Sequence, residues 1–96
     1  MRIKLVSIMV ENQDKAVTFY TDVLGFRLSK DIPLGEFRWI TVVSPDGHPD
    51  VELSLEPNAN PAGRAFQEAM FKQGIPVAAF EDADTCGNLI QLYQPV

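Results

Sequence analysis

Residues 84–95 read Asp-Thr-Cys-Gly-Asn-Leu-Ile-Gln-Leu-Tyr-Gln-Pro, a turn followed by an alternating strand that stops at a proline. Residues 46–57 have the same layout and read Asp-Gly-His-Pro-Asp-Val-Glu-Leu-Ser-Leu-Glu-Pro. Glu52 and Gln91 hold matching places, each directly before a leucine. Two similar strands, each with one polar side chain at the same place, predict two related modules that face a shared site.

The first module is predicted from residues 3–57, whose pattern reads strand, helix, strand, strand, strand. Residues 3–11 and 26–32 alternate with a period of two, and residues 37–44 and 51–56 have strand composition. Between them, residues 13–24 carry apolar side chains at helical spacing, with Asn12 as N-cap and Gly25 as the residue that ends the helix. Residues 33–35 are predicted to form a turn.

The second module is predicted to be incomplete. Asn60 and Pro61 favour a helix start, Gly74 ends that helix, and strands are expected at residues 75–81 and 89–94. A parallel strand pair needs a crossover of about a dozen residues, so residues 81–87 are too few for one. Three explanations stay open: a segment missing from the sequence, a real internal deletion, or a last strand that pairs elsewhere. With a deletion, the two strands form an antiparallel hairpin or exchange with a second copy of the chain.

Composition narrows the function classes. The chain has 96 residues, which is enough for one domain with a modest core, and a net charge of −5. Its Lys and Arg residues are scattered, which argues against a nucleic-acid surface, and no apolar run is long enough to cross a membrane. One cysteine excludes an internal disulfide and is compatible with the cytosol, so a cytoplasmic location is expected.

Three segments carry a resemblance to a known family. Residues 14–26, Asp-Lys-Ala-Val-Thr-Phe-Tyr-Thr-Asp-Val-Leu-Gly-Phe, resemble the first-helix signature of the vicinal oxygen chelate superfamily. That superfamily includes glyoxalase I, bleomycin-resistance proteins and extradiol dioxygenases. Residues 87–92 are similar to its final strand, and residues 74–80 look like the strand that opens its second module.

The resemblance implies an α+β, glyoxalase-like fold in a single domain, residues 1–96. A complete βαβββ module is expected at residues 1–57, a linker loop and helix at 58–74, and a partial second module with two strands at 75–96. The full family fold has paired modules whose sheets curve around a cavity.

The resemblance also places the family's four metal-binding positions at Leu5, Glu52, Val77 and Gln91. Leu5 and Val77 have no lone pair, and Gln91 offers a neutral carbonyl oxygen. Metal sites of this kind need three or four N, O or S donors, so we expect no metal cofactor here, with a divalent metal as the alternative. The one histidine, His48, lies in a predicted turn and is expected to be exposed.

Candidate ligand-binding residues are Glu52, Gln91, Trp39, Phe37 and Tyr93, because binding cavities are mainly apolar with a few polar groups. Glu52 is also the candidate catalytic residue, for which a raised pKa would be supporting evidence. The structural alternatives are ordinary strand polarity for Glu52 and Gln91, and core packing for the aromatic residues, to which Phe80 is added.

Three functions follow from the resemblance. The first is metal-free binding of a small organic molecule in an apolar cavity, as in the bleomycin-resistance branch. The second is a divalent-metal-dependent lyase, isomerase or dioxygenase, so enzyme activity stays an open question. The third is a degenerate, truncated copy that mainly self-associates. The expected partners are a small-molecule ligand and a second copy in a homodimer, with strand exchange as one form of that dimer. No nucleic acid and no membrane are expected as partners.

Overall fold

The computed structural model describes the backbone of residues 1–82 and 88–92, and side chains as far as Glu81. The elements run along the chain in the order β1 (Leu5–Val10), α1 (Gln13–Thr18), the π-helical η1 (Phe19–Val23), β2 (Arg27–Leu34), β3 (Phe37–Val43), β4 (Glu52–Pro57), α2 (Pro61–Gln73), β5 (Ala78–Asp82) and β6 (Asn88–Leu92). This α+β order confirms the predicted βαβββ module followed by a helix and two strands.

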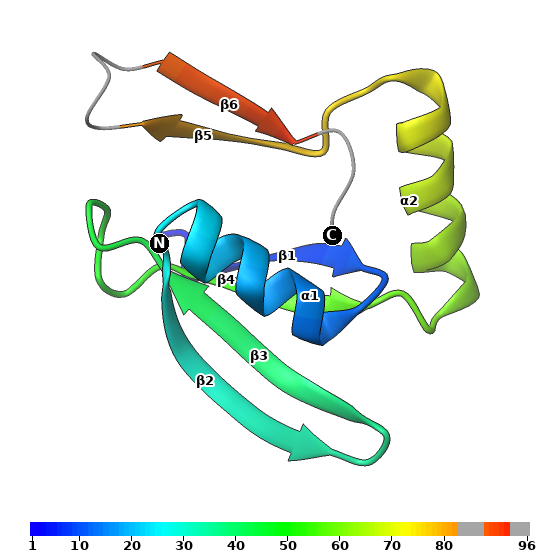
Figure 1. The fold of residues 1–96 in the computed structure, drawn as a ribbon, viewed down its shortest axis with the longest axis horizontal. Coiled ribbons are helices and arrows are strands. Elements are labelled where there is room, and N and C mark those ends of the chain that lie inside the picture. Colours follow the sequence, from blue (N-terminus) through cyan, green and yellow to red (C-terminus); the bar gives the residue numbers. More distant parts are fainter. Residues whose placement is uncertain (83–87, 93–96) are drawn as a thin grey trace.

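The first six of these segments, β1 to β4, build a four-stranded sheet covered by α1 and η1. The strand order is β1-β4-β3-β2, with β1 parallel to β4 and the other pairs antiparallel. Figure 1 shows α1 crossing over this sheet, with the β2–β3 hairpin extending away below it. The chain between β1 and β4 forms the helix and hairpin, which gives the crossover that a parallel pair requires.

The core lies between α1 and the sheet. Alternate residues of the strands point toward the helix, and the buried apolar cluster combines them with two helical side chains: Ile8, Val10, Ala16, Tyr20, Ile40, Val42 and Leu55. The residues between them in sequence, such as Ser7, Thr41 and Ser54, must therefore point to the opposite face. We call this opposite face of the sheet the polar face, defined by Ser7, Lys30, Thr41, Glu52, Ser54 and Glu56.

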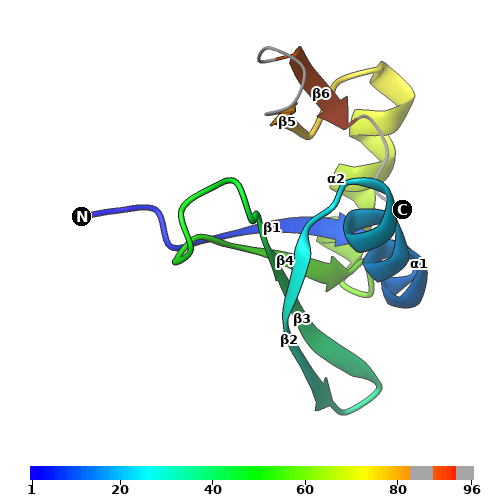
Figure 2. The same cartoon turned by 60° about the vertical axis from the view of Figure 1, so that its left-hand side comes forward.

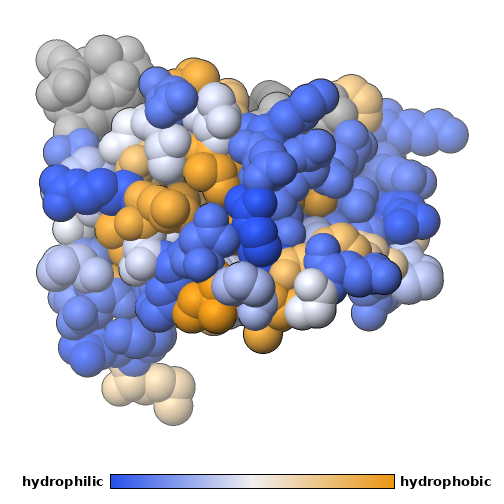
Figure 3. All heavy atoms as spheres, turned by 60° about the horizontal axis from the view of Figure 1, so that its bottom comes forward, coloured by the Kyte–Doolittle hydropathy of each residue, from blue (hydrophilic) through white to orange (hydrophobic). Residues whose placement is uncertain are grey.

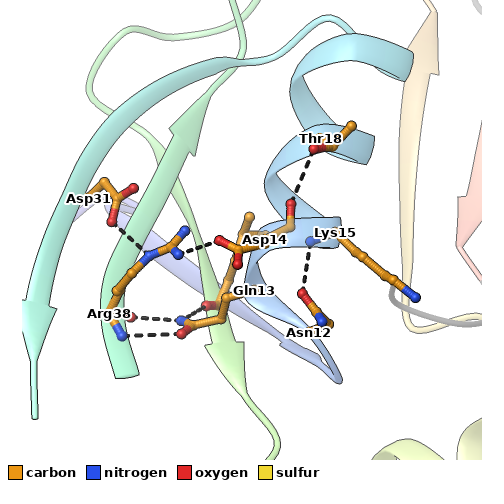
Figure 4. A network of polar contacts seen from close by, with 8 residues as sticks. Asn12, Gln13, Asp14, Lys15, Thr18, Asp31 and Arg38 are labelled. Atoms are coloured by element: carbon orange, nitrogen blue, oxygen red, sulfur yellow. Dashed lines mark hydrogen bonds and ion pairs between the residues drawn. The ribbon is translucent and has the colours of Figure 1, made fainter. Parts of the chain in front are cut away.

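Polar side chains hold the start of α1 against the sheet (Figure 4). Gln13 donates from Nε2 to the carbonyls of Arg38 (2.7 Å) and Leu55 (3.1 Å), and its Oε1 accepts from the Arg38 amide (3.1 Å). The Arg38 guanidinium also bridges Asp14 of α1 and Asp31 of β2. Hydrogen bonding to Asp14 raises the pKa of Arg38 further. The Arg38 guanidinium is therefore engaged by two carboxylates.

The helix boundaries agree with the sequence patterns, and two details differ. The Asn12 side chain caps α1 and Gly25 takes a left-handed φ of 78°. The last turn widens into η1. The predicted turn at residues 33–35 was wrong at its first two positions, because β2 continues to Leu34. Pro33 is tolerated there because β2 is an edge strand of its sheet.

Helix α2 is tied to β1 by a buried amide. Asn60 caps its start and Gly74 its end, as predicted. Gln67 is 3% exposed, donates from Nε2 to the Met9 carbonyl (3.3 Å) and accepts from the Asn58 side chain (2.7 Å). Gln67 thereby hydrogen-bonds to β1 on the side away from β4, where Met9 would otherwise have a free strand edge.

Strands β5 and β6 form a separate antiparallel pair, with Ala79 opposite Gln91. This confirms the hairpin alternative for the short second module. Figures 1 and 2 show the pair on the far side of α1 from the β2–β3 hairpin. Phe80 of β5 packs edge-on against Tyr20 and Phe26, with ring centroids 6.2 and 5.2 Å away. Phe80 thus packs between the β5–β6 pair and the first module. This agrees with the prediction that it is a core residue rather than a residue lining a ligand cavity.

The surface mixes hydrophilic and apolar side chains, and Figure 3 shows the apolar ones in separate patches on the face turned toward the viewer. None of the helices in the described part of the chain is long and apolar enough to cross a membrane.

Candidate functional site

A row of polar residues crosses the sheet on the polar face. Ser7 of β1 is the register partner of Ser54, Ser54 is the partner of Thr41, and Thr41 is the partner of Lys30. One hydrophilic residue from each strand therefore stands in line. Thr41 and Ser54 are at most 1% exposed, so their hydroxyls have to find partners within the protein. Those partners are Glu52 for Thr41 and Glu56 for Ser54.

Glu52 collects three donors on one oxygen. Its Oε1 accepts from Lys30 Nζ (2.5 Å), Thr41 Oγ1 (2.8 Å) and Ser29 Oγ (3.1 Å). Ser29 and Lys30 are neighbours, which in a regular strand would face opposite sides. A register irregularity between Leu28 and Lys30 lets both side chains reach the same carboxylate.

These contacts fix the charge of Glu52. The hydrogen bond from Lys30, followed by that from Thr41, lowers the pKa of Glu52 to about 2. A carboxylate this weakly basic is a poor general base near neutral pH. A raised pKa would have supported a catalytic role for Glu52, whereas its pKa is lowered. The geometry therefore favours Glu52 as a binding group that stays charged near neutral pH.

The donor set fits a divalent metal poorly. Leu5 is the register partner of Glu52, so two of the positions that the family resemblance assigns to metal binding do lie side by side. Leu5 contributes no donor atom, and an ammonium group already bonds to Glu52. No group of three or more His, Cys, Asp or Glu side chains in the described residues is arranged to hold a metal ion.

An apolar pocket borders the polar row at its β1 end. It has a volume of about 410 Å³ and lies between β1 and α2, lined by Ser7, Ile8, Met9, Ala62, Gly63, Phe66 and Val77. This volume is in the range of small-molecule sites. Ser7 belongs to both the pocket and the polar row, which makes the two features continuous. Val77, one of the positions assigned to metal binding, thus contributes apolar surface to this pocket.

The other predicted residues are distributed as follows. Trp39 is partly buried on β3 and shares the polar face with Thr41, whereas Phe37 is 41% exposed and lines a smaller hollow near Gln13. Gln91 lies in β6 opposite Ala79, and its side chain falls outside the described residues, as does all of Tyr93. His48 is exposed in its loop, as predicted, and its Nδ1 accepts from the Asp50 amide. Cys86 also falls outside the described residues.

Sequence reasoning missed Lys30, Thr41, Ser54 and Glu56. The alternation of β3 and β4 could have placed Thr41, Ser54 and Glu56 on the face of Glu52. Lys30 could not have been found in this way, because the irregularity in β2 changes which side chains face Glu52.

The family follows from comparison with known proteins. Residues 2–89 match the model of the Glyoxalase/Bleomycin resistance protein/Dioxygenase superfamily. The chain belongs to this superfamily.

Three known proteins are similar to this chain. The uncharacterized protein YurT of Bacillus subtilis (strain 168) is 39% identical over 126 residues, covering 98% of this chain and 99% of YurT. The crystal structure of UcmS2 is 36% identical with a TM-score of 0.66, covering 80% of this chain and 61% of UcmS2. TnmS3, an antibiotic binding protein from Streptomyces sp. CB03234, is 26% identical with a TM-score of 0.52, covering 100% of this chain and 97% of TnmS3.

The YurT alignment is longer than this chain. It runs over 126 positions although this chain has 96 residues, and it covers both proteins almost end to end. YurT therefore has about thirty residues, inside the aligned region, without a counterpart here.

Proposed function

We propose that this protein binds a small organic molecule without a metal ion, at the polar face and the adjoining pocket. The observation that carries the proposal is the Lys30–Glu52 ion pair, which puts a cation of the chain itself at the carboxylate where the family resemblance places a metal ligand. The similarity to TnmS3, which is described as an antibiotic binding protein, supports a small organic molecule as the ligand.

The two parts of the site have different tasks. The pocket between β1 and α2 takes the apolar body of the ligand, because burial of apolar surface supplies most of the affinity in such sites. The polar face fixes the orientation, since its less buried polar groups, Ser7, Lys30 and the two carboxylates, favour a ligand whose polar atoms face them. Gln91, Tyr93 and Phe37 stay candidate contacts.

The proposal includes a homodimer in the cytoplasm. Leu5 and Val6 of the edge strand β1 are 42% and 47% exposed, and apolar side chains on an edge strand favour association with a second copy. Light scattering of the purified protein at micromolar concentration tests this part, and a monomer would contradict it.

Binding is tested through Trp39, the one tryptophan of the chain. We expect compounds from a panel of uncharged and charged aromatic molecules to change its fluorescence and raise the melting temperature. The response should be the same with EDTA and with added Zn²⁺ or Ni²⁺. A response that requires the metal would overturn the metal-free proposal.

The variant Lys30→Ala separates the ion pair from general effects. Removal of the ammonium leaves Glu52 without its cation, so we expect weaker ligand binding. Zn²⁺ binding by calorimetry should stay undetectable, because one carboxylate supplies too few donors for a metal site. Lys72→Ala, at an exposed position on α2, is the matched control and should behave as the wild type.

A further inference from the structure

Glu56 stands between the pocket and the rest of the polar face. It is the register partner of Met9, whose side chain lines the pocket. Neighbouring strands are about 5 Å apart, so Glu56 lies one strand away from the pocket, beside the lining residue Met9. Glu56 is partly buried rather than extended into solvent.

Among the described residues, Glu56 has no cationic side chain as a partner. Within the described residues, its hydrogen-bond partner is the Ser54 hydroxyl, at 2.8 Å from Oε1, and its carboxylate takes part in none of the ion pairs. Glu52 differs in this respect, since Lys30 neutralises it. The polar face therefore has one compensated and one uncompensated carboxylate.

The surroundings of Glu56 favour positive charge in a ligand. The net charge of the chain is −5, and an anionic ligand would be repelled by Glu56 at close range in a partly desolvated site. Trp39 lies on the same face, and the face of an indole ring attracts cations. An apolar pocket, a carboxylate on the neighbouring strand and a tryptophan on the same face are the elements of a site for an organic cation.

We propose that the ligand of this site is a hydrophobic cation, an amine or quaternary ammonium group on an apolar body, whose charge pairs with Glu56. This inference rests on the proposed function, because it names the class of molecule that the same site takes. The apolar body fills the space lined by Met9, Phe66 and Val77.

The test compares two probes that differ in charge alone. A phenylalkyl trimethylammonium ion and its tert-butyl isostere, in which carbon replaces nitrogen, have the same shape. Calorimetry with wild-type protein should show the cation binding at least about tenfold tighter, because its charge is closely paired with a carboxylate in a partly desolvated site. The corresponding sulfonate should bind more weakly than either.

Variants connect this preference with Glu56. Glu56→Gln keeps the shape and an acceptor for Ser54, and it should bring the cation down to the affinity of the neutral isostere. Glu68→Gln, at an exposed position on α2, makes the same charge change and should leave the preference intact. Trp39→Leu is the second variant, and it should weaken the cation more than the neutral probe.

The outcomes separate the two proposals. Equal binding of the cation and its isostere, or a preference that survives Glu56→Gln in a folded variant, overturns the cation inference and leaves the proposed function standing. If neither probe binds, and the wider panel gives no response at Trp39, both are overturned.

Discussion

The four-stranded sheet and the β5–β6 hairpin have different connections between their first and last strands. In the sheet, residues 11–51 separate β1 from β4, and the two strands are parallel neighbours. In the hairpin, residues 83–87 separate β5 from β6, and the strands are antiparallel. The length of chain between two strands thus decides their relative direction, because a short connection cannot return to the starting end.

The direction of each strand pair also decides which side chains lie together at the site. The parallel pair brings Leu5 beside Glu52 and Met9 beside Glu56, so the first module has a complete face with a row of polar residues. In the hairpin, Phe80 instead packs against the aromatic rings of Tyr20 and Phe26. We infer that the first module carries the binding chemistry, and that the second contributes packing and one wall of the pocket through Val77.

The largest effect on stability is expected when a side chain in the core of the four-stranded sheet is truncated. Leu55 is 1% exposed, and Leu55→Ala should lower the free energy of unfolding by about 3 kcal/mol, measured by urea denaturation. Phe80→Ala in the hairpin should cost less, about 2 kcal/mol, because Phe80 is only partly buried. Leu34→Ala, at a position 60% exposed, is the control and should change stability by less than about 1 kcal/mol. A larger loss for Phe80 than for Leu55 would reverse the ranking of the two regions.

A smaller effect with a pH signature is expected at Glu52. Glu52→Gln removes the charge that binds Lys30 and should cost about 1–2 kcal/mol at pH 7. The pKa of Glu52 is lowered from 4.5 to about 2, so its contribution is present above pH 4.5 and is lost as the pH falls toward 2. Denaturation curves of wild type and variant should therefore converge at low pH. A difference that stays constant with pH would show that the loss comes from packing.

The degree to which these features could be predicted differs along the chain. Helix caps at Asn12 and Asn60 follow from local chemistry, and the structure confirms both. The length of residues 81–87 excluded a parallel pair but left the hairpin as one of several alternatives, and the structure selects the hairpin. The contacts of Glu52 depend on the irregularity in β2, a tertiary feature without a signature in the sequence of Ser29 and Lys30.

The smallest expected effect lies where the two regions meet, at Tyr20. Its ring stacks on Phe26 with centroids 6.1 Å apart, and Phe80 packs against its edge. The side chain is fully buried, and among the described residues its hydroxyl has no hydrogen-bond partner. A buried, unpaired hydroxyl costs about 1–3 kcal/mol, so Tyr20→Phe should stabilise the protein by about 1 kcal/mol, seen as a higher melting temperature.

The pH dependence gives this last prediction a second readout. Burial raises the pKa of Tyr20, so the folded state keeps the phenol neutral while the unfolded chain ionises above pH 10. Wild-type stability should therefore fall as the pH rises above 10, and Tyr20→Phe should lose this part of the decline. Tyr20→Leu, which removes the ring as well, should be destabilised at every pH. A loss of stability in Tyr20→Phe at pH 7 would mean that the hydroxyl makes a stabilising contact, and the junction between the two regions would then be polar.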